Sequence, residues 1–251
     1  MFGRLHLARR AALGRLAVAR RRHQALVHRV RTAARGPQGC ETATKRQLGC
    51  RWTHWEKVVA RPREFDEEAA LDIAMQCFWH RGFETTSVRD LADQMGITQT
   101  SLYNTFGDKR ALYTRSLEHY LDQSIRERVK RFERLPPTKA IEGFFMEIVE
   151  RSIADKALRG CMLVNTGLEI APHDPEFRKI VARELSFIEE FFRSHIAAGQ
   201  TSGAIRPDVP AGELAKMLLS LWLGLRVLAR SRPQRAVLEG AVRAALAVML
   251  V

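Results

Sequence analysis

Residues 85–108 read TTSVRDLADQMGITQTSLYNTFGD, and this stretch decides the fold. Ser87, with Asp90 three residues later, forms a capping box, which predicts that a helix begins there. Gly96 ends this helix, since a tight turn needs a residue that tolerates positive φ. Thr98 is suited to cap a second short helix. Two short helices joined by a glycine turn are the pattern of a helix-turn-helix.

Apolar residues recur at helical spacing on both sides of this motif. No segment shows the period-2 alternation of a strand, so the sequence predicts an all-α protein. Pro136 and Pro137 cannot continue a helix and divide a three-helix domain over residues 61–134 from a second helical region over residues 135–251. The predicted helices span about residues 69–81, 88–95, 98–106, 108–135, 141–149, 161–170, 174–198, 211–229 and 233–250.

The second helix of the motif carries short polar side chains suited to base edges. In a DNA-binding helix-turn-helix, the first helix crosses the phosphate backbone and the second lies in the major groove. Gln and Asn can read adenine with two hydrogen bonds, and a Thr methyl can contact thymine. Helix–glycine–helix patterns also occur in ordinary helical bundles, so spacing alone leaves DNA binding open. The candidate base-reading residues are Thr98, Gln99, Thr100, Ser101 and Asn104.

Residues 66–113 also resemble the N-terminal domain of TetR/AcrR-family repressors. The resemblance rests on AMQCFWHRGF (74–83), TSVRDLA (86–92), GI (96–97) and SLYNTFGDK (101–109). It implies a cytoplasmic, sequence-specific transcriptional repressor that binds a palindromic operator as a homodimer. A small molecule, an electrophile or an oxidant would release the operator. The residues matching phosphate-binding positions are Thr86, Ser87, Tyr103 and Lys109, and those matching base-reading positions are Gln99, Thr100, Ser101 and Asn104. Helix capping alone would also explain Ser87, and simple solvation would explain Lys109.

For residues 135–251, the resemblance implies effector binding and dimerisation through the last two helices. An apolar surface on the first of these two helices is too large for one partner helix to cover. Part of that surface has an alternative role in the intramolecular core. The dimer-interface candidates are Met217, Leu218, Leu221, Leu225 and Leu228. The candidates for the pocket of an unknown effector are Phe144, Phe145, Met162, Asn165, Phe187 and Trp222, and plain core packing is the alternative for each.

Cys161 follows Arg159 and Gly160 at the start of a predicted helix. A thiol at a helix N-terminus beside an arginine is expected to react readily, and faster than Cys77 on the apolar face of an earlier helix. The segment also resembles family members that respond to electrophiles and oxidants. The alternatives are a cysteine that fills a gap in the core, or an enzyme that uses the thiol with His173 and Asp174. No oxyanion element is visible in the sequence, so we expect no catalytic residues and no enzyme.

Net charge is concentrated at the start of the chain. The formal charge is +13, yet residues 1–60 hold 14 Lys and Arg against 2 acidic residues, and the remainder holds 27 against 26. The four cysteines are scattered without metal-ligand spacing, so we expect no metal site and no cofactor. The longest apolar run, residues 217–229, contains Gly224 and Arg226 and is too short to span a bilayer, which predicts no membrane partner.

Residues 1–60 are predicted to be a disordered, Arg-rich extension. Charge, composition and periodicity change just before Ala60, and ARPREFD (60–66) resembles the opening of family members. We therefore expect the natural protein to start at Val59, read from a GTG codon as Met, with residues 1–58 either an artefact of gene calling or a disordered extension. The alternative is an architectural protein that binds nucleic acid through this arm.

Overall fold

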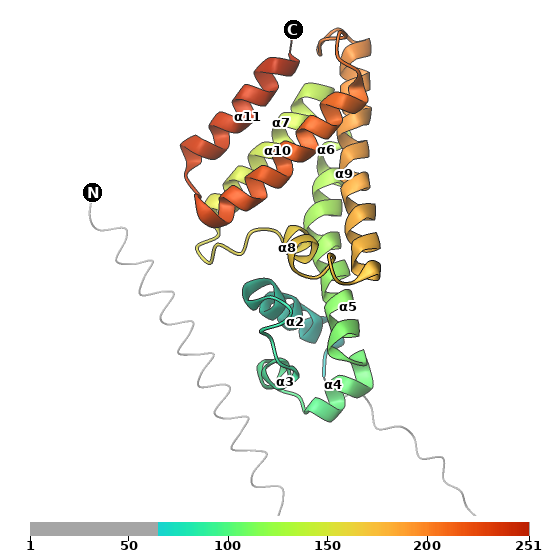
Figure 1. Ribbon diagram of the computed structural model, residues 1–251, viewed down its shortest axis with the longest axis vertical. Helices are drawn as coiled ribbons and strands as arrows, with labels where there is room; N and C mark the ends of the chain where they lie inside the picture. Colours follow the sequence, from blue (N-terminus) through green and yellow to red (C-terminus); the bar gives the residue numbers. More distant parts are fainter. Residues whose placement is uncertain (1–64, 251) are drawn as a thin grey trace, which may run out of the picture. The chain divides into compact units, whose positions relative to one another are not determined.

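The computed structural model describes residues 65–250, which are helical apart from connecting turns and one isolated β-bridge between Ile205 and Leu250 (Figure 1). The all-α class is confirmed for this range. Expectations about residues 1–60, including a start at Val59, lie outside the described residues. In chain order the elements are α2 (Glu67–Arg81), α3 (Val88–Met95), α4 (Gln99–Phe106), α5 (Lys109–Leu121), the π-helical segment η1 (Asp122–Arg126), α6 (Glu127–Phe132), α7 (Pro137–Ala154), α8 (Met162–Glu169), α9 (Pro175–Thr201), α10 (Ala211–Ser231) and α11 (Arg235–Met249).

Side-chain caps set the starts of the helices around the motif. The Ser87 hydroxyl accepts a hydrogen bond from the Asp90 amide at 3.0 Å, and Thr98 Oγ1 accepts one from the Ser101 amide at 3.1 Å. Between them, Gly96 has φ 68° and ψ 27°, in the left-handed region that a side chain disfavours. Local hydrogen bonding and one glycine therefore define the predicted helix–turn–helix geometry.

One face of each short helix is buried against α2 and α5. Leu91 of α3 and Leu102 of α4 are completely buried, and Phe106 is 3% exposed. Beneath them, the rings of Phe78 in α2 and Tyr113 in α5 meet edge to face with centroids 4.9 Å apart. This packing fixes the orientation of α4 and leaves its opposite face toward solvent.

The helix expected over residues 108–135 contains an irregular segment. Elements α5, η1 and α6 follow one another without a break, but Asp122–Arg126 is π-helical, and the last helical residue is Phe132. Within this stretch, the Ser124 hydroxyl donates to the Tyr120 carbonyl at 2.7 Å. Arg126 Nη2 donates to Glu184 Oε1 of α9 at 2.7 Å. The spacing of apolar residues in the sequence does not reveal this π-helical segment, because one π turn shifts the helical register of only a few residues.

The C-terminal helices share an aromatic core. Helices α9 and α10 run side by side and both contact α7 (Figure 1). Phe145 of α7 stacks on Phe192 of α9 at a centroid distance of 5.3 Å, and Phe144 meets Phe192 edge to face. Trp222 of α10 is 1% exposed in the same core.

Polar side-chain contacts join the helix-turn-helix region to the C-terminal helices. The Tyr113 and Thr166 hydroxyls are 2.8 Å apart and buried, which connects α5 to α8. Arg110 at the start of α5 donates to both carboxylate oxygens of Asp174, the N-cap of α9, at 3.0 Å. The helix-turn-helix therefore has direct contacts through which the C-terminal helices can influence it.

Candidate functional site

Helix α4 presents an exposed polar face. Gln99, Thr100 and Asn104 are exposed, and their side chains form no hydrogen bond with another residue in the range 65–250. The buried residues Leu102 and Phe106 lie on the other side of the helix. Amide and hydroxyl groups without an internal role are available to read base edges.

Two other predicted base-reading residues already have a local role. The Thr98 and Ser101 hydroxyls are 2.9 Å apart, and the Thr98 oxygen also accepts the Ser101 amide. These contacts stabilise the first turn of α4. The structure thus separates a capping pair from the freely exposed Gln99, Thr100 and Asn104.

The four predicted phosphate-binding residues also differ in their exposure. Ser87 is exposed at the start of α3, and Tyr103 is 48% exposed. Lys109 Nζ lies 3.4 Å from the Glu84 carbonyl oxygen and 4.4 Å from the ring centroid of Phe83, so its charge sits beside the segment that leads into α3. Helix N-termini with a nearby cation bind phosphate well.

Thr86 requires a correction. Its side chain is completely buried, and its hydroxyl donates to the Gly82 carbonyl at 2.7 Å. This hydroxyl connects the end of α2 to the start of α3 and is unavailable to a phosphate. The match of Thr86 to the family motif therefore reflects its role in the fold and not a contact with DNA.

The predicted dimer-interface residues on α10 fall into a buried group and a partly exposed group. Leu218 and Leu225 are 0% and 1% exposed within a single chain, so they belong to its own core, and their assignment to the dimer interface is wrong. Their side of the helix packs on α9 and α7. Met217, Leu221 and Leu228 lie on the outer side and remain partly exposed. These three residues are the remaining interface candidates.

Most predicted effector residues belong to the core. Phe144, Phe145, Met162 and Trp222 are each at most 1% exposed. Asn165 donates to the Arg159 carbonyl and accepts from Arg230, both at 3.0 Å, so its amide holds the loop before α8 against α10. None of the five lines either of the two cavities described here. Phe187 is 39% exposed and lines a cavity of about 440 Å³ between α9 and the α6–α7 turn.

A different cavity, of about 460 Å³, was not predicted from the sequence. It lies between α2, α5 to α7, the loop before α8, and α10. The sequence contains one sign of this cavity, because the charged Arg226 interrupts the apolar run of α10. Taken alone, that charge argues against a membrane span and does not point to a cavity. The lining residues are Trp79, Tyr120, Ser124, Arg128, Arg151, Ser152, Ala154, Asp155, Lys156, Arg159, Gly160, Arg226 and Ala229.

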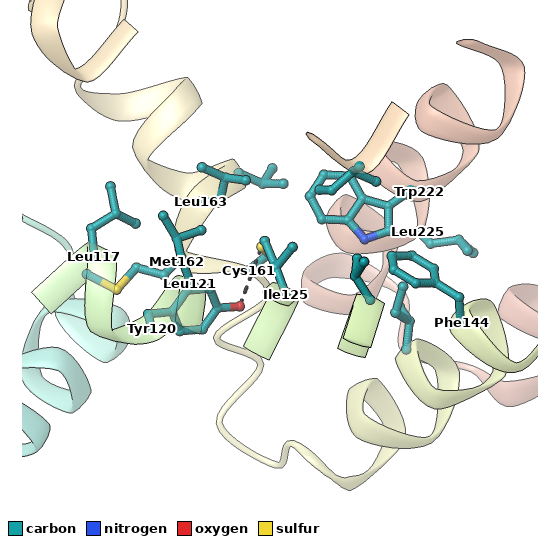
Figure 2. Close-up of a cluster of buried hydrophobic side chains, with 14 of the residues drawn as sticks. Leu117, Tyr120, Leu121, Ile125, Phe144, Cys161, Met162, Leu163, Trp222 and Leu225 are labelled. Carbon is teal, nitrogen blue, oxygen red and sulfur yellow. Dashed lines mark hydrogen bonds between the residues drawn. The ribbon is translucent and has the colours of Figure 1, made fainter. Parts of the chain in front are cut away.

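Cys161 lies immediately behind this cavity. Its thiol is 1% exposed and accepts a hydrogen bond from the Tyr120 hydroxyl at 3.5 Å, the dashed contact in Figure 2. The Arg226 guanidinium is a second neighbour. Cys77, in contrast, is half-buried, and burial raises the pKa of its thiol. The expectation that Cys161 reacts faster assumed a protected Cys77, whereas Cys161 is the more deeply buried thiol, so its burial opposes that expectation.

The residues of the alternative thiol enzyme are separated. Cys161 precedes α8 and His173 follows it, and an eight-residue helix spans about 12 Å. Asp174 caps α9 and binds Arg110, so its carboxylate is already occupied. In residues 65–250, no cluster of His, Cys, Asp and Glu is arranged to hold a metal ion. None of the helices in this range combines the length and the hydrophobicity that a membrane span needs.

These features define a helix-turn-helix DNA-binding protein with a helical regulatory region, and comparison with known proteins agrees. Residues 70–115 match the family model described as "Bacterial regulatory proteins, tetR family", and residues 137–245 match the "Tetracyclin repressor-like, C-terminal domain". The chain belongs to the TetR family of transcriptional regulators.

Similar proteins match most of the chain. The uncharacterized regulator YezE of Bacillus subtilis is 29% identical over 76% of this chain and 100% of its own length. The repressor BdcR of Escherichia coli is 30% identical over 64% of this chain and 83% of its own. A solved structure of the TetR family regulator CifR, a cysteine mutant bound to 26 bp of double-strand operator DNA, has a TM-score of 0.68 and 33% identity, covering 75% of this chain and 99% of that one.

Proposed function

We propose that this TetR family regulator represses transcription by binding a specific operator through α4. The observation that carries the proposal is the polar face of Gln99, Thr100 and Asn104, exposed opposite the buried Leu102 and Phe106. Base edges supply the hydrogen-bond partners that this face lacks within the chain. The amides at the start of α3, together with Lys109, hold the adjacent phosphates.

The protein acts as a homodimer on a two-fold symmetric operator. One reading helix covers too few base pairs for a unique site, and two copies double the sequence that is read. Met217, Leu221 and Leu228 on the outer face of α10 supply an apolar contact for the second copy. Such a regulator works in the cytoplasm, where chromosomal DNA is accessible.

A signal received by the C-terminal helices releases the operator. The Tyr113–Thr166 and Arg110–Asp174 contacts connect these helices to α5, on which the helix-turn-helix packs. The Cys161 thiol offers one route for an electrophile that first enters the neighbouring cavity. Its burial favours reagents small enough to pass Tyr120.

Selection of bound duplexes from random DNA tests this function. We expect enrichment of one two-fold symmetric sequence, with half-sites separated by about one helical turn of 10 bp or a multiple of it. Replacing Gln99 or Asn104 by Ala should relax one base position in each half-site. Recovery of no common sequence, or of the same sequence by both variants, would reject the assignment of α4.

A further inference from the structure

The 460 Å³ cavity carries an excess of positive charge. Its cationic residues come from α6, α7, the loop before α8, and α10, so the charge does not belong to a single solvated helix face. Asp155 supplies the one carboxylate in the cavity lining. The cationic lining residues are Arg128, Arg151, Lys156, Arg159 and Arg226.

The carboxylates nearby leave Arg226 without an anionic partner. Arg159 is held by Asp155 at 3.1 Å. Glu147 lies behind the lining and is shared by Arg128 at 3.2 Å, Arg151 at 2.9 Å and a third arginine. Arg226 is only 7% exposed, and among residues 65–250 it forms no salt bridge. Its Nη2 donates to the Gly160 carbonyl at 2.8 Å.

Three residues of the lining each carry a buried polar atom that has no hydrogen-bond partner in residues 65–250. These atoms are Nε of Arg226, Oγ of Ser152 and Nε1 of Trp79. Each of these groups can donate a proton, and two of them can only donate. A buried donor without a partner costs about 1–3 kcal/mol, so the arrangement suits a ligand that accepts hydrogen bonds.

The same wall is also aromatic. Trp79 and Tyr120 meet edge to face with centroids 5.0 Å apart. Burial is the first cause that raises the pKa of Tyr120 to about 12, so its hydroxyl is neutral at pH 7. Burial also lowers the pKa of Arg128, and the positive charge of Arg226 lowers it further. A nearby anion would relieve this repulsion between two buried cations.

We propose that this cavity binds a small aromatic carboxylate. Arg226, Ser152 and Trp79 donate to the carboxylate, and the ligand ring packs on Trp79 and Tyr120. The volume lies within the range of small-molecule sites. The assignment names the effector class of the regulator, and its effect on DNA rests on the proposed function.

The cavity also contacts the helix-turn-helix region directly. Trp79 belongs to α2, and the Arg159 guanidinium lies 4.1 Å from its ring centroid. Arg159 Nη1 donates to Gln76 Oε1, also in α2, at 2.6 Å. An anion that attracts Arg159 competes with these contacts and shifts α2, on which α3 packs. Ligand binding therefore lowers operator affinity.

Titration of the full chain with 2-naphthoate, compared with the neutral 2-naphthamide, tests the site by calorimetry. We expect naphthoate to bind once per chain and the amide to bind at least about 10-fold more weakly, as expected for loss of a charged hydrogen bond. Arg226→Gln keeps a donor for Gly160 but removes the charge, and it should weaken naphthoate binding about 10- to 100-fold. Lys216→Gln, which removes one exposed positive charge of α10 outside the lining, is the matched control and should bind like the parent.

Trp79→Phe provides a second variant if Arg226→Gln does not fold. It removes the indole N–H and part of the ring surface while keeping an aromatic side chain, and it should weaken naphthoate binding several-fold. Equal binding of the acid and the amide, undiminished binding by the folded variants, or no saturable binding of naphthoate at millimolar concentration would overturn the site. Fluorescence anisotropy of the selected operator, measured with and without naphthoate, then separates the proposed ligand site from the proposed DNA-binding function. Failure of the parent to bind DNA rejects the proposed function, whereas naphthoate binding with unchanged operator affinity rejects only the coupling.

Discussion

Replacing Gly96 by Ala should destabilise the protein through backbone strain alone. The residue has φ 68° in the turn between α3 and α4, and its amide bonds to the Ala92 and Asp93 carbonyls. A Cβ added here would meet no atom within 4 Å, so no steric clash contributes. The left-handed conformation costs a residue with a side chain about 1–2 kcal/mol. Restricting the unfolded chain returns about 0.4–1 kcal/mol, which leaves a net loss of about 1 kcal/mol.

Equilibrium unfolding in urea measures this loss, with Gly212→Ala as the matched control. Gly212 also has open space around its Cβ position but lies in the first turn of α10 without a positive φ, so its replacement should be neutral or stabilising. Gly96→Asn should cost less than Gly96→Ala, because Asn tolerates the left-handed region. The reasoning fails if Gly96→Ala is as stable as Gly212→Ala, or if Asn costs more than Ala.

Three further predictions concern charge, assembly and thiol access. Lys109→Gln should weaken binding to all DNA sequences alike and lower the salt slope by about 1, and an unchanged slope would remove Lys109 from the phosphate contacts. Leu221→Glu should give folded monomers by light scattering, whereas Leu225→Glu should unfold the chain; a dimeric Leu221→Glu variant would place the interface elsewhere. A bulky maleimide should label half-buried Cys77 faster than buried Cys161, and mass spectrometry showing the reverse order would mean that the loop before α8 opens readily.

The parts of the fold that depend on neighbouring residues could be predicted from the sequence. The caps at Ser87 and Thr98 and the turn at Gly96 act within four residues, and the structure has all three. The second bond of the predicted capping box, from the Ser87 amide to the Asp90 carboxylate, is not formed. The same local chemistry places Asp174 as the cap of α9. Such hydrogen bonds form with the chain's own amides and do not depend on tertiary packing.

Features set by distant contacts were missed or wrongly assigned. An apolar leucine on α10 fits the core and a dimer face equally well in sequence, and only packing on α9 shows that Leu218 belongs to the core. Thr86 matches a DNA-binding motif, yet its hydroxyl is used by Gly82. The carboxylate cavity depends on Trp79, Ser152 and Arg226, which come from three helices far apart in the chain. No spacing rule could bring these residues together.

Operator discrimination by the full chain tests the central claim most directly. The measurement is the ratio of the Kd for a scrambled duplex to the Kd for the selected operator. It compares the parent with a Gln99→Ala/Asn104→Ala double variant, and Arg193→Ala, an exposed residue of α9, is the control. Each lost base contact costs about 1–3 kcal/mol, so the double variant should lose at least about 10-fold of its preference while its affinity for scrambled DNA stays unchanged. The control should keep the preference of the parent. A double variant that still prefers the operator as strongly as the parent would contradict the assignment of α4 as the reading helix.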